Sequence, residues 1–127
     1  MHITTPEGTQ DRLFAECLER RQVQGALVEL FRRRGYAEVI TPEVEYYDLF
    51  LQSGNPLPQE SMLKIIDRSG KIMVMRPDST APIARVAATK LKGLPLPQRL
   101  YYDQSVFRLG DAPAGGSTET AQCRVER

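Results

Sequence analysis

The chain has 127 residues, with 17 Lys and Arg against 16 Asp and Glu, so its formal net charge at neutral pH is +1. This length fits one domain, and the hydrophobic fraction of 41% and charged fraction of 26% are those of an ordinary globular protein. A balanced charge gives no long-range positive field. We therefore exclude a general polyanion binder or membrane-surface protein and expect neither nucleic acid nor membrane as a partner.

The chain holds two cysteines and one histidine, which are too few to form a thiolate or imidazole metal site. Cys17 and Cys123 lie far apart and neither belongs to a CxxC pair. The first residues lack the basic start and the apolar core of a signal peptide, and no apolar run approaches the length of a membrane span. We therefore expect a cytoplasmic protein that carries no metal and no cofactor.

The spacing of apolar residues predicts a long helix over 11–34, with a slip of phase near Arg21. Three arginines at 32–34 fill its last turn, where cations oppose the negative end of the helix dipole. Gly35 follows and can adopt the left-handed conformation that ends a helix. We interpret the arginine run as a solvated helix end and not as a nucleic-acid patch.

Short apolar runs predict the first strands. The run 36–42 is rich in β-forming residues and closes with a proline, which ends a strand or places it at an edge. The runs 62–66 and 72–75 flank a turn with Gly70 at the expected positive-φ position, which predicts an antiparallel hairpin. Residues 52–59 have the composition of a loop.

A second helix is predicted over about 82–91, with Ser79 or Thr80 as its N-terminal cap. The run 99–108 then alternates as a strand, and a polar loop follows over 110–120. Helices separate only some of the strands, and two connections resemble hairpins. The predicted class is therefore α+β with an antiparallel sheet, rather than a parallel βαβ array.

Polar side chains follow two of the predicted strands. Arg76, Asp78 and Thr80 come after one strand, and Arg108 ends the next. Taken singly, Asp78 is better explained as a helix cap and Arg108 as a solvated strand end. Taken together, they form either mutual salt bridges or a ligand cradle. Phosphate-loop, dinucleotide and nucleophile-elbow motifs are absent from the sequence.

The order of these segments resembles the N-terminal half of the catalytic domain of histidyl-tRNA synthetase. It is still more similar to that enzyme's non-aminoacylating paralogue, the regulatory subunit of ATP phosphoribosyltransferase. Residues 6–11 match the Gly-x-x-Asp opening of the family, 36–50 its motif 1 and 99–126 its motif 2. The resemblance implies one incomplete class II aminoacyl-tRNA synthetase-like domain over 1–127, an antiparallel sheet flanked by helices, with a dimer interface at Pro42.

The resemblance also implies a histidine pocket. Asp78, Thr80 and Gln122 would hold the α-ammonium group, Arg108 the α-carboxylate and Glu126 the imidazole. A zwitterion needs a cationic fork beside hydrogen-bond acceptors, and the arginine guanidinium supplies a bidentate geometry that lysine cannot.

The loop after Arg108 departs from the synthetase pattern. Leu109 and Gly110 follow this arginine at the place where synthetases have a Glu that binds adenine, and residues 111–120 contain no Lys or Arg. Such a loop offers little to a triphosphate or to an RNA end. We therefore expect a binding module without a catalytic site, and no enzyme.

Three hypotheses follow. The leading one is a regulatory subunit of histidine biosynthesis that binds histidine and sets the activity and feedback inhibition of the short catalytic ATP phosphoribosyltransferase subunit, as a homodimer within a hetero-oligomer. The alternative is a fragment of histidyl-tRNA synthetase or of another class II synthetase, which activates an amino acid with ATP. The third is an inert remnant.

The last residue, Arg127, comes before the position of motif 3, so we expect a truncated domain with an exposed sheet edge. The alternative is that 110–127 forms a disordered natural tail.

Overall fold

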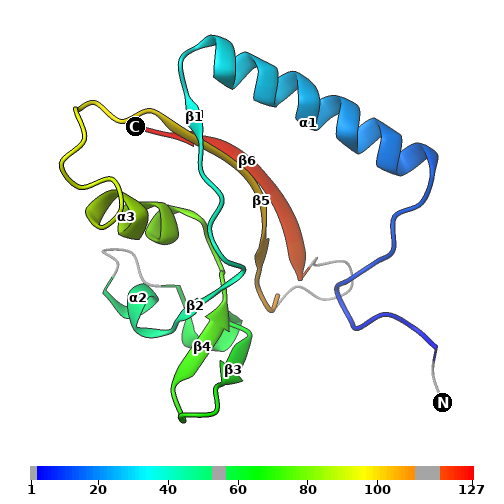
Figure 1. The fold of residues 1–127 in the computed structure, drawn as a ribbon. Coiled ribbons are helices and arrows are strands. Elements are labelled where there is room, and N and C mark those ends of the chain that lie inside the picture. Colours follow the sequence, from blue (N-terminus) through cyan, green and yellow to red (C-terminus); the bar gives the residue numbers. More distant parts are fainter. Residues whose placement is uncertain (1–2, 53–56, 111–117) are drawn as a thin grey trace.

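The computed structural model describes residues 3–52, 57–110 and 118–127. Its elements in chain order are α1 (Ala15–Arg33), β1 (Ala37–Glu38), β2 (Val44–Tyr46), α2 (Asp48–Leu51), the 3-10 turn η1 (Gln59–Ser61), β3 (Lys64–Ile66), β4 (Ile72–Met75), α3 (Thr80–Ala88), β5 (Leu100–Phe107) and β6 (Glu119–Glu126). The strands form two three-stranded sheets, ordered β1-β5-β6 and β2-β4-β3 (Figure 1). The predicted α+β class is confirmed.

The first sheet is built on the antiparallel pair β5–β6. The two strands pair over eight residues each, from Leu100 opposite Glu126 to Phe107 opposite Glu119. β1 pairs with β5 in parallel, which departs from the all-antiparallel sheet predicted. The strand predicted over 36–42 shortens to two residues because the chain leaves the ladder by Thr41, whose backbone N–H donates to the side chain of Gln104.

The β5–β6 pair has a different helix on each face (Figure 1). Side chains alternate along a strand, so Leu100 and Tyr102 lie on one face, where they pack with Ile83 of α3. Tyr101 lies on the other face, where its ring contacts Phe31 of α1 with the ring centroids 5.7 Å apart. This alternation decides which residues of β6 can approach each helix.

The second sheet carries a small core of its own. Tyr47, Phe50, Met62 and Val74 are buried together between α2 and the sheet. The predicted hairpin is confirmed as β3 and β4, with Gly70 in the turn at φ 83°. This sheet ends in the segment that leads into α3, and so it fixes where that helix begins.

Both predicted helices differ from their expected bounds. α1 begins at Ala15 and not at residue 11, because Phe14 has a φ of 49°, which is incompatible with the first turn of a helix. Gly35 closes α1 at φ 84°, as predicted. α3 covers 80–88 instead of 82–91, since Thr89 leaves helical geometry at φ −114° and ψ −80°. No residue of α1 is buried.

The C-terminal residues form a strand, although one alternative from the sequence was a disordered tail over 110–127. β6 occupies Glu119–Glu126, so that alternative is wrong for these residues. Most of the loop predicted over 110–120, and residues 53–56 of the loop predicted over 52–59, lie outside the described residues. Among the described helices, none combines the length and the apolar character needed to cross a bilayer.

Candidate functional site

A groove of about 680 Å³ opens between α2, α3 and the β5–β6 pair. Its lining residues are Leu49, Gln52, Leu57, Asp78, Thr80, Ala81, Ala84, Arg85, Arg108 and Arg124. Three of the five predicted ligand residues, Asp78, Thr80 and Arg108, are therefore brought together. The other two, Gln122 and Glu126, lie on β6, on the same strand face as Arg124.

Asp78 stands at the start of α3. Its Oδ1 accepts a hydrogen bond from the backbone N–H of Ala81 at 3.1 Å, so the carboxylate caps the helix. The prediction that Ser79 or Thr80 caps α3 is wrong, since neither side chain bonds the first turn. The Ser79 hydroxyl instead accepts from the Gln104 amide. The second carboxylate oxygen of Asp78 makes no hydrogen bond to a described residue, and Asp78 is a lining residue of the groove.

Glu126 is linked to the groove residue Thr80 and to the buried Tyr102 through their hydroxyl groups. Its Oε1 accepts from Thr80 Oγ1 at 3.1 Å and from the Tyr102 hydroxyl at 3.4 Å. Burial and the charge of Glu126 raise the pKa of Tyr102, which keeps its hydroxyl protonated as a donor. Tyr102 is fully buried, so this donor is fixed in place, while Glu126 Oε2 makes no hydrogen bond to a described residue.

Arg108 follows β5 directly and is exposed. Its Nε donates to the backbone carbonyl of Pro77 at 2.7 Å, which ties the side chain to the segment before α3. Its backbone N–H donates to Thr118 at the start of the return strand. The two terminal nitrogens of the guanidinium make no bond to a described residue. Arg108 is therefore a positioned fork with two free donors at the groove.

Gln122 is not a lining residue of the groove. It sits opposite Gln104 in the strand register, on the face that carries Arg124 and Glu126. Its Oε1 atom is buried and accepts no hydrogen bond within the described part of the chain. A buried carbonyl without a donor is costly, so this oxygen is a candidate acceptor for a ligand N–H.

Arg76 has a structural role and is not a ligand contact. It is 4% exposed, and its Nε and Nη1 donate to the backbone carbonyls of Ser105 and Thr41 at 2.6 and 3.0 Å. Burial lowers the pKa of Arg76, with the charges of Glu43 and Glu45 opposing that shift. The guanidinium thus joins β5 to the chain before β2.

Two groove arginines were missed from the sequence. Arg85 of α3 donates from Nε and Nη2 to the carboxylate of Glu45 at 3.1 and 2.7 Å. Arg124 lines the groove from β6. Arg124 could have been found from the sequence, because it lies between Gln122 and Glu126 and residues two apart on a strand share a face.

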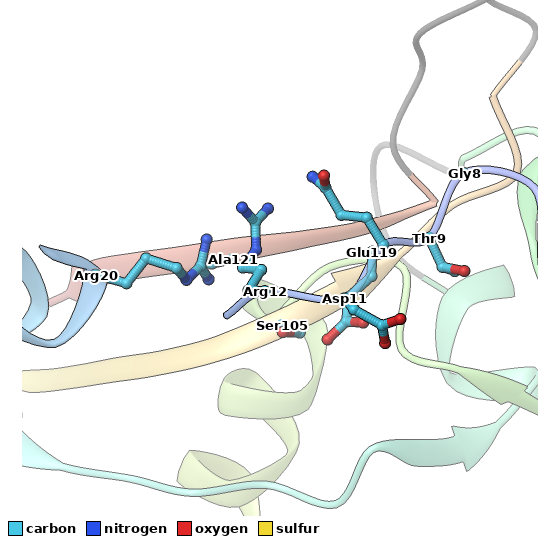
Figure 2. A pocket seen from close by; sticks show the side chains of 9 residues that line it. Gly8, Thr9, Asp11, Arg12, Arg20, Ser105, Glu119 and Ala121 are labelled. Carbon is cyan, nitrogen blue, oxygen red and sulfur yellow. The ribbon is translucent and has the colours of Figure 1, made fainter. Parts of the chain in front are cut away.

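A second hollow of about 310 Å³ lies on the opposite face of the same strands. Residues 8–12 line it with Arg20 of α1 and with Ser105, Glu119 and Ala121 of the sheet (Figure 2). Figure 2 shows Arg20 extending from α1 along β6 toward Arg12. Gly8 has a φ of 81°, and a Cβ there would collide with the hydroxyl oxygen and the backbone nitrogen of Thr118. Only glycine therefore fits this close approach to the start of β6.

Comparison with known proteins identifies the family of this chain. The family model described as histidyl-tRNA synthetase matches residues 8–127. The chain belongs to this family. A relative from Alkaliphilus metalliredigens named ATP phosphoribosyltransferase regulatory subunit is 46% identical over 124 residues, which are 98% of this chain and 31% of the relative. A protein of the same name from Acetivibrio thermocellus is also 46% identical, over 98% of this chain and 30% of its own length.

Solved structures of this family give the same result for the fold. A structure from Bacillus halodurans described as an ATP phosphoribosyltransferase regulatory subunit/histidyl-tRNA synthetase has a TM-score of 0.86 at 32% identity and covers 98% of this chain and 32% of its own. Histidyl-tRNA synthetase of S. aureus has a TM-score of 0.73 at 32% identity, over 84% of this chain and 26% of its own. The expected class II synthetase-like fold and the resemblance to the regulatory paralogue are confirmed. The chain spans about a third of these relatives.

Proposed function

We propose that the chain acts as a non-catalytic regulatory subunit of ATP phosphoribosyltransferase in the cytoplasm and that it binds histidine in the groove at α3. The observation that carries this proposal is the convergence of Asp78, Thr80 and Arg108 on one groove, with Glu126 attached to Thr80 by a hydrogen bond. These are the groups that a free amino acid needs: a cationic fork, carboxylates and a hydroxyl.

Each ligand group has a matching partner. The two free nitrogens of the Arg108 guanidinium suit the α-carboxylate, and the free oxygen of Asp78 suits the α-ammonium group. Glu126 Oε2 suits an imidazole N–H, and the buried Gln122 Oε1 supplies one more acceptor. The name of the relatives supports the regulatory role, and the lack of Lys and Arg over 111–120 supports a groove that binds no triphosphate.

Regulation requires a partner and two states. The partner we propose is the short catalytic subunit, joined to a dimer of this chain that forms near Pro42. Pro42 is exposed and the neighbouring Ile40 side chain is 80% exposed, so this surface is available for contact. Histidine then changes activity only if it binds the active and inhibited assemblies with different affinity.

Calorimetry tests the histidine pocket. Arg108→Ala should weaken histidine binding by about 2–4 kcal/mol, because the α-carboxylate loses its charged partner. Arg68→Ala removes the same charge from the exposed β3–β4 turn and should leave the dissociation constant unchanged. An unchanged constant in Arg108→Ala, with the fold intact by circular dichroism, would place histidine elsewhere.

A pair of activity assays separates this proposal from an aminoacylating function. Mixing the protein with the short catalytic subunit should raise phosphoribosyltransferase activity, and added histidine should lower it again. ATP–pyrophosphate exchange should be absent. ATP–pyrophosphate exchange without any effect on the transferase would favour the synthetase alternative. No response in either assay, together with no histidine binding, would favour an inert remnant.

A further inference from the structure

Arg85 lines the groove, but it is bound by a carboxylate that does not. Its Nε and Nη2 donate to the two carboxylate oxygens of Glu45 on β2, at 3.1 and 2.7 Å. Glu45 lies 40 positions away in the sequence, and its side chain is 9% exposed, against 32% for Arg85. The two other ion pairs between described residues join side chains only four positions apart. This bidentate contact therefore ties α3 to the second sheet.

Glu45 is set among buried groups of the second sheet. In the strand register it stands opposite Val74, which is fully buried in the core of that sheet. Because directly opposed residues share a face of a sheet, the carboxylate extends from the apolar side. Burial lowers the pKa of Arg76, and Glu45 is one of two carboxylates whose charges oppose that shift. A carboxylate in such a place is costly without a cation beside it, so Arg85 and Glu45 depend on each other.

The charges around the groove balance only when Glu45 is included. The described lining residues include four charged side chains: Asp78, Arg85, Arg108 and Arg124. Glu126 lies on the same face of β6 as Arg124, two positions along the strand, and offsets its charge. Glu45 offsets the charge of Arg85 in the same way. One negative and one positive group then remain, which is the pattern that a zwitterion requires.

We propose that Glu45 is a positioning residue that sets the specificity of the groove: by binding the Arg85 fork, it makes the groove select a zwitterionic amino acid over the corresponding anion. Asp78, the proposed partner of the α-ammonium group, is seven positions before Arg85, which is about 10 Å at the rise of a helix. An unpaired guanidinium at this distance repels an ammonium group and attracts a carboxylate. This inference extends the proposed histidine site and rests on it.

Calorimetry with three ligands of similar shape tests the role of Glu45. L-Histidine carries an ammonium group and a carboxylate, histamine lacks the carboxylate, and 3-(imidazol-4-yl)propanoate lacks the ammonium group. At fixed ionic strength and about pH 8, where an imidazole is neutral, the wild type should prefer histidine to the propanoate. Glu45→Gln should weaken the binding of histidine and of histamine about three- to tenfold and should strengthen the binding of the propanoate. A purely structural loss would weaken all three.

Further variants separate the charge of Glu45 from its structural contribution. The double variant Glu45→Gln with Arg85→Gln removes both charges and should restore the preference for histidine, although the ion pair is gone. Arg85→Lys keeps both charges but loses the bidentate fork. It should shift the preference in the direction of Glu45→Gln by a smaller factor, and it provides the test if Glu45→Gln does not fold. Glu29→Gln removes a carboxylate from an exposed ion pair with Arg33 on α1 and should bind all three ligands like the wild type.

The outcomes for this inference and for the proposed function differ. The role of Glu45 is overturned if Glu45→Gln changes the three affinities by the same factor or leaves them unchanged while the wild type binds histidine. It is also overturned if the double variant keeps the altered preference, if Arg85→Lys leaves the preference unchanged, or if Glu29→Gln shifts it as much as Glu45→Gln. A wild type that binds no histidine contradicts the proposed function, and this inference with it.

Discussion

The two faces of the β5–β6 pair are built in different ways. On the face toward α3, Tyr102 and Ile83 are buried together, and hydroxyl, amide and carboxylate groups bond one another around the groove. On the face toward α1, no residue of the helix is buried, and a hollow of about 540 Å³ lies between part of the helix and the strands, although Phe31 contacts Tyr101. The α3 face of these two strands is therefore well packed and hydrogen-bonded, whereas the α1 face is covered less completely.

This difference separates what holds the domain together from what it offers to other molecules. The α3 face has fixed polar groups with few open positions, which suits recognition of a small ligand. The α1 face exposes apolar side chains such as Val23, which is 61% exposed, beside polar and charged ones. Similar substitutions on the two faces should therefore differ in their effects on stability and on ligand binding.

The largest expected difference concerns the helices. Ile83→Ala in α3 should lower the free energy of unfolding by about 2–4 kcal/mol, because it removes a buried side chain from contact with Leu100 and Tyr102. Val23→Ala in α1 should cost about 0.5 kcal/mol or less, since that side chain is mostly exposed. Urea unfolding measures both. Equal losses would show that α1 packs as firmly as α3.

The next effect concerns buried charge. Arg76→Met should cost about 2–3 kcal/mol, because the carbonyls of Ser105 and Thr41 lose their donors at a buried site. Arg21→Met on exposed α1 is the control and should leave stability within about 0.5 kcal/mol of the wild type. Urea unfolding of both variants decides this. If Arg76→Met left the free energy of unfolding unchanged, water would be replacing the guanidinium as a donor without a loss of stability.

Substitutions of two neighbouring tyrosines allow the two faces to be compared directly. Tyr102→Phe should cost about 1 kcal/mol of stability and should also weaken histidine binding several-fold, because Glu126 loses a hydrogen-bond donor. Tyr101→Phe removes a hydroxyl that donates to Glu38 at 2.8 Å on the α1 face. It should cost a similar amount of stability and leave histidine binding unchanged. Thermal unfolding and calorimetry give the two readouts, and an equal loss of affinity in both variants would contradict the separation of the faces.

The smallest effect is a pH dependence on the α1 face. Burial, with the charge of Glu38, raises the pKa of Asp103 above 3.8, while Arg20 and Arg21 oppose the shift. A raised folded-state pKa means that protonation stabilises the fold, and that this stabilisation is lost as the pH rises through the folded-state pKa. Asp103→Asn should therefore raise the melting temperature at neutral pH by about 1–2 °C, and the gain should vanish near pH 3.8. A gain that does not change with pH would show that the charge of Asp103 is not its cause.

Much of the sheet could be predicted from local patterns. The alternation over 99–108 predicts β5, and Gly70 between two apolar runs predicts the hairpin, because strand period and turn chemistry are properties of adjacent residues. The shortening of the strand predicted over 36–42 could not be predicted. It results from the contact between Thr41 and Gln104, residues 63 positions apart.

The candidate site was predicted in part. Asp78, Thr80 and Arg108 were selected from motifs, and the structure brings them to one groove. Arg76 belonged to the same polar cluster in the sequence, yet its guanidinium points into the protein and bonds backbone carbonyls. No local signal separates Arg76 from Arg108, because the difference between a buried and an available guanidinium depends on which carbonyls another strand presents.

The sequence by itself determined the family, the α+β class, the main strands and the side chains that can meet an amino acid, since each of these is written in short-range patterns and motif order. The tertiary structure decided which of those side chains remain available. A capping bond within the α3 segment occupies one oxygen of Asp78, whereas hydrogen bonds between distant segments occupy one oxygen of Glu126, Nε and Nη2 of Arg85 and Nε of Arg108. The terminal nitrogens of Arg108 are left without a bond to a described residue. A donor or acceptor serves a ligand only after the fold has satisfied its own polar groups, and that allocation exists only in three dimensions.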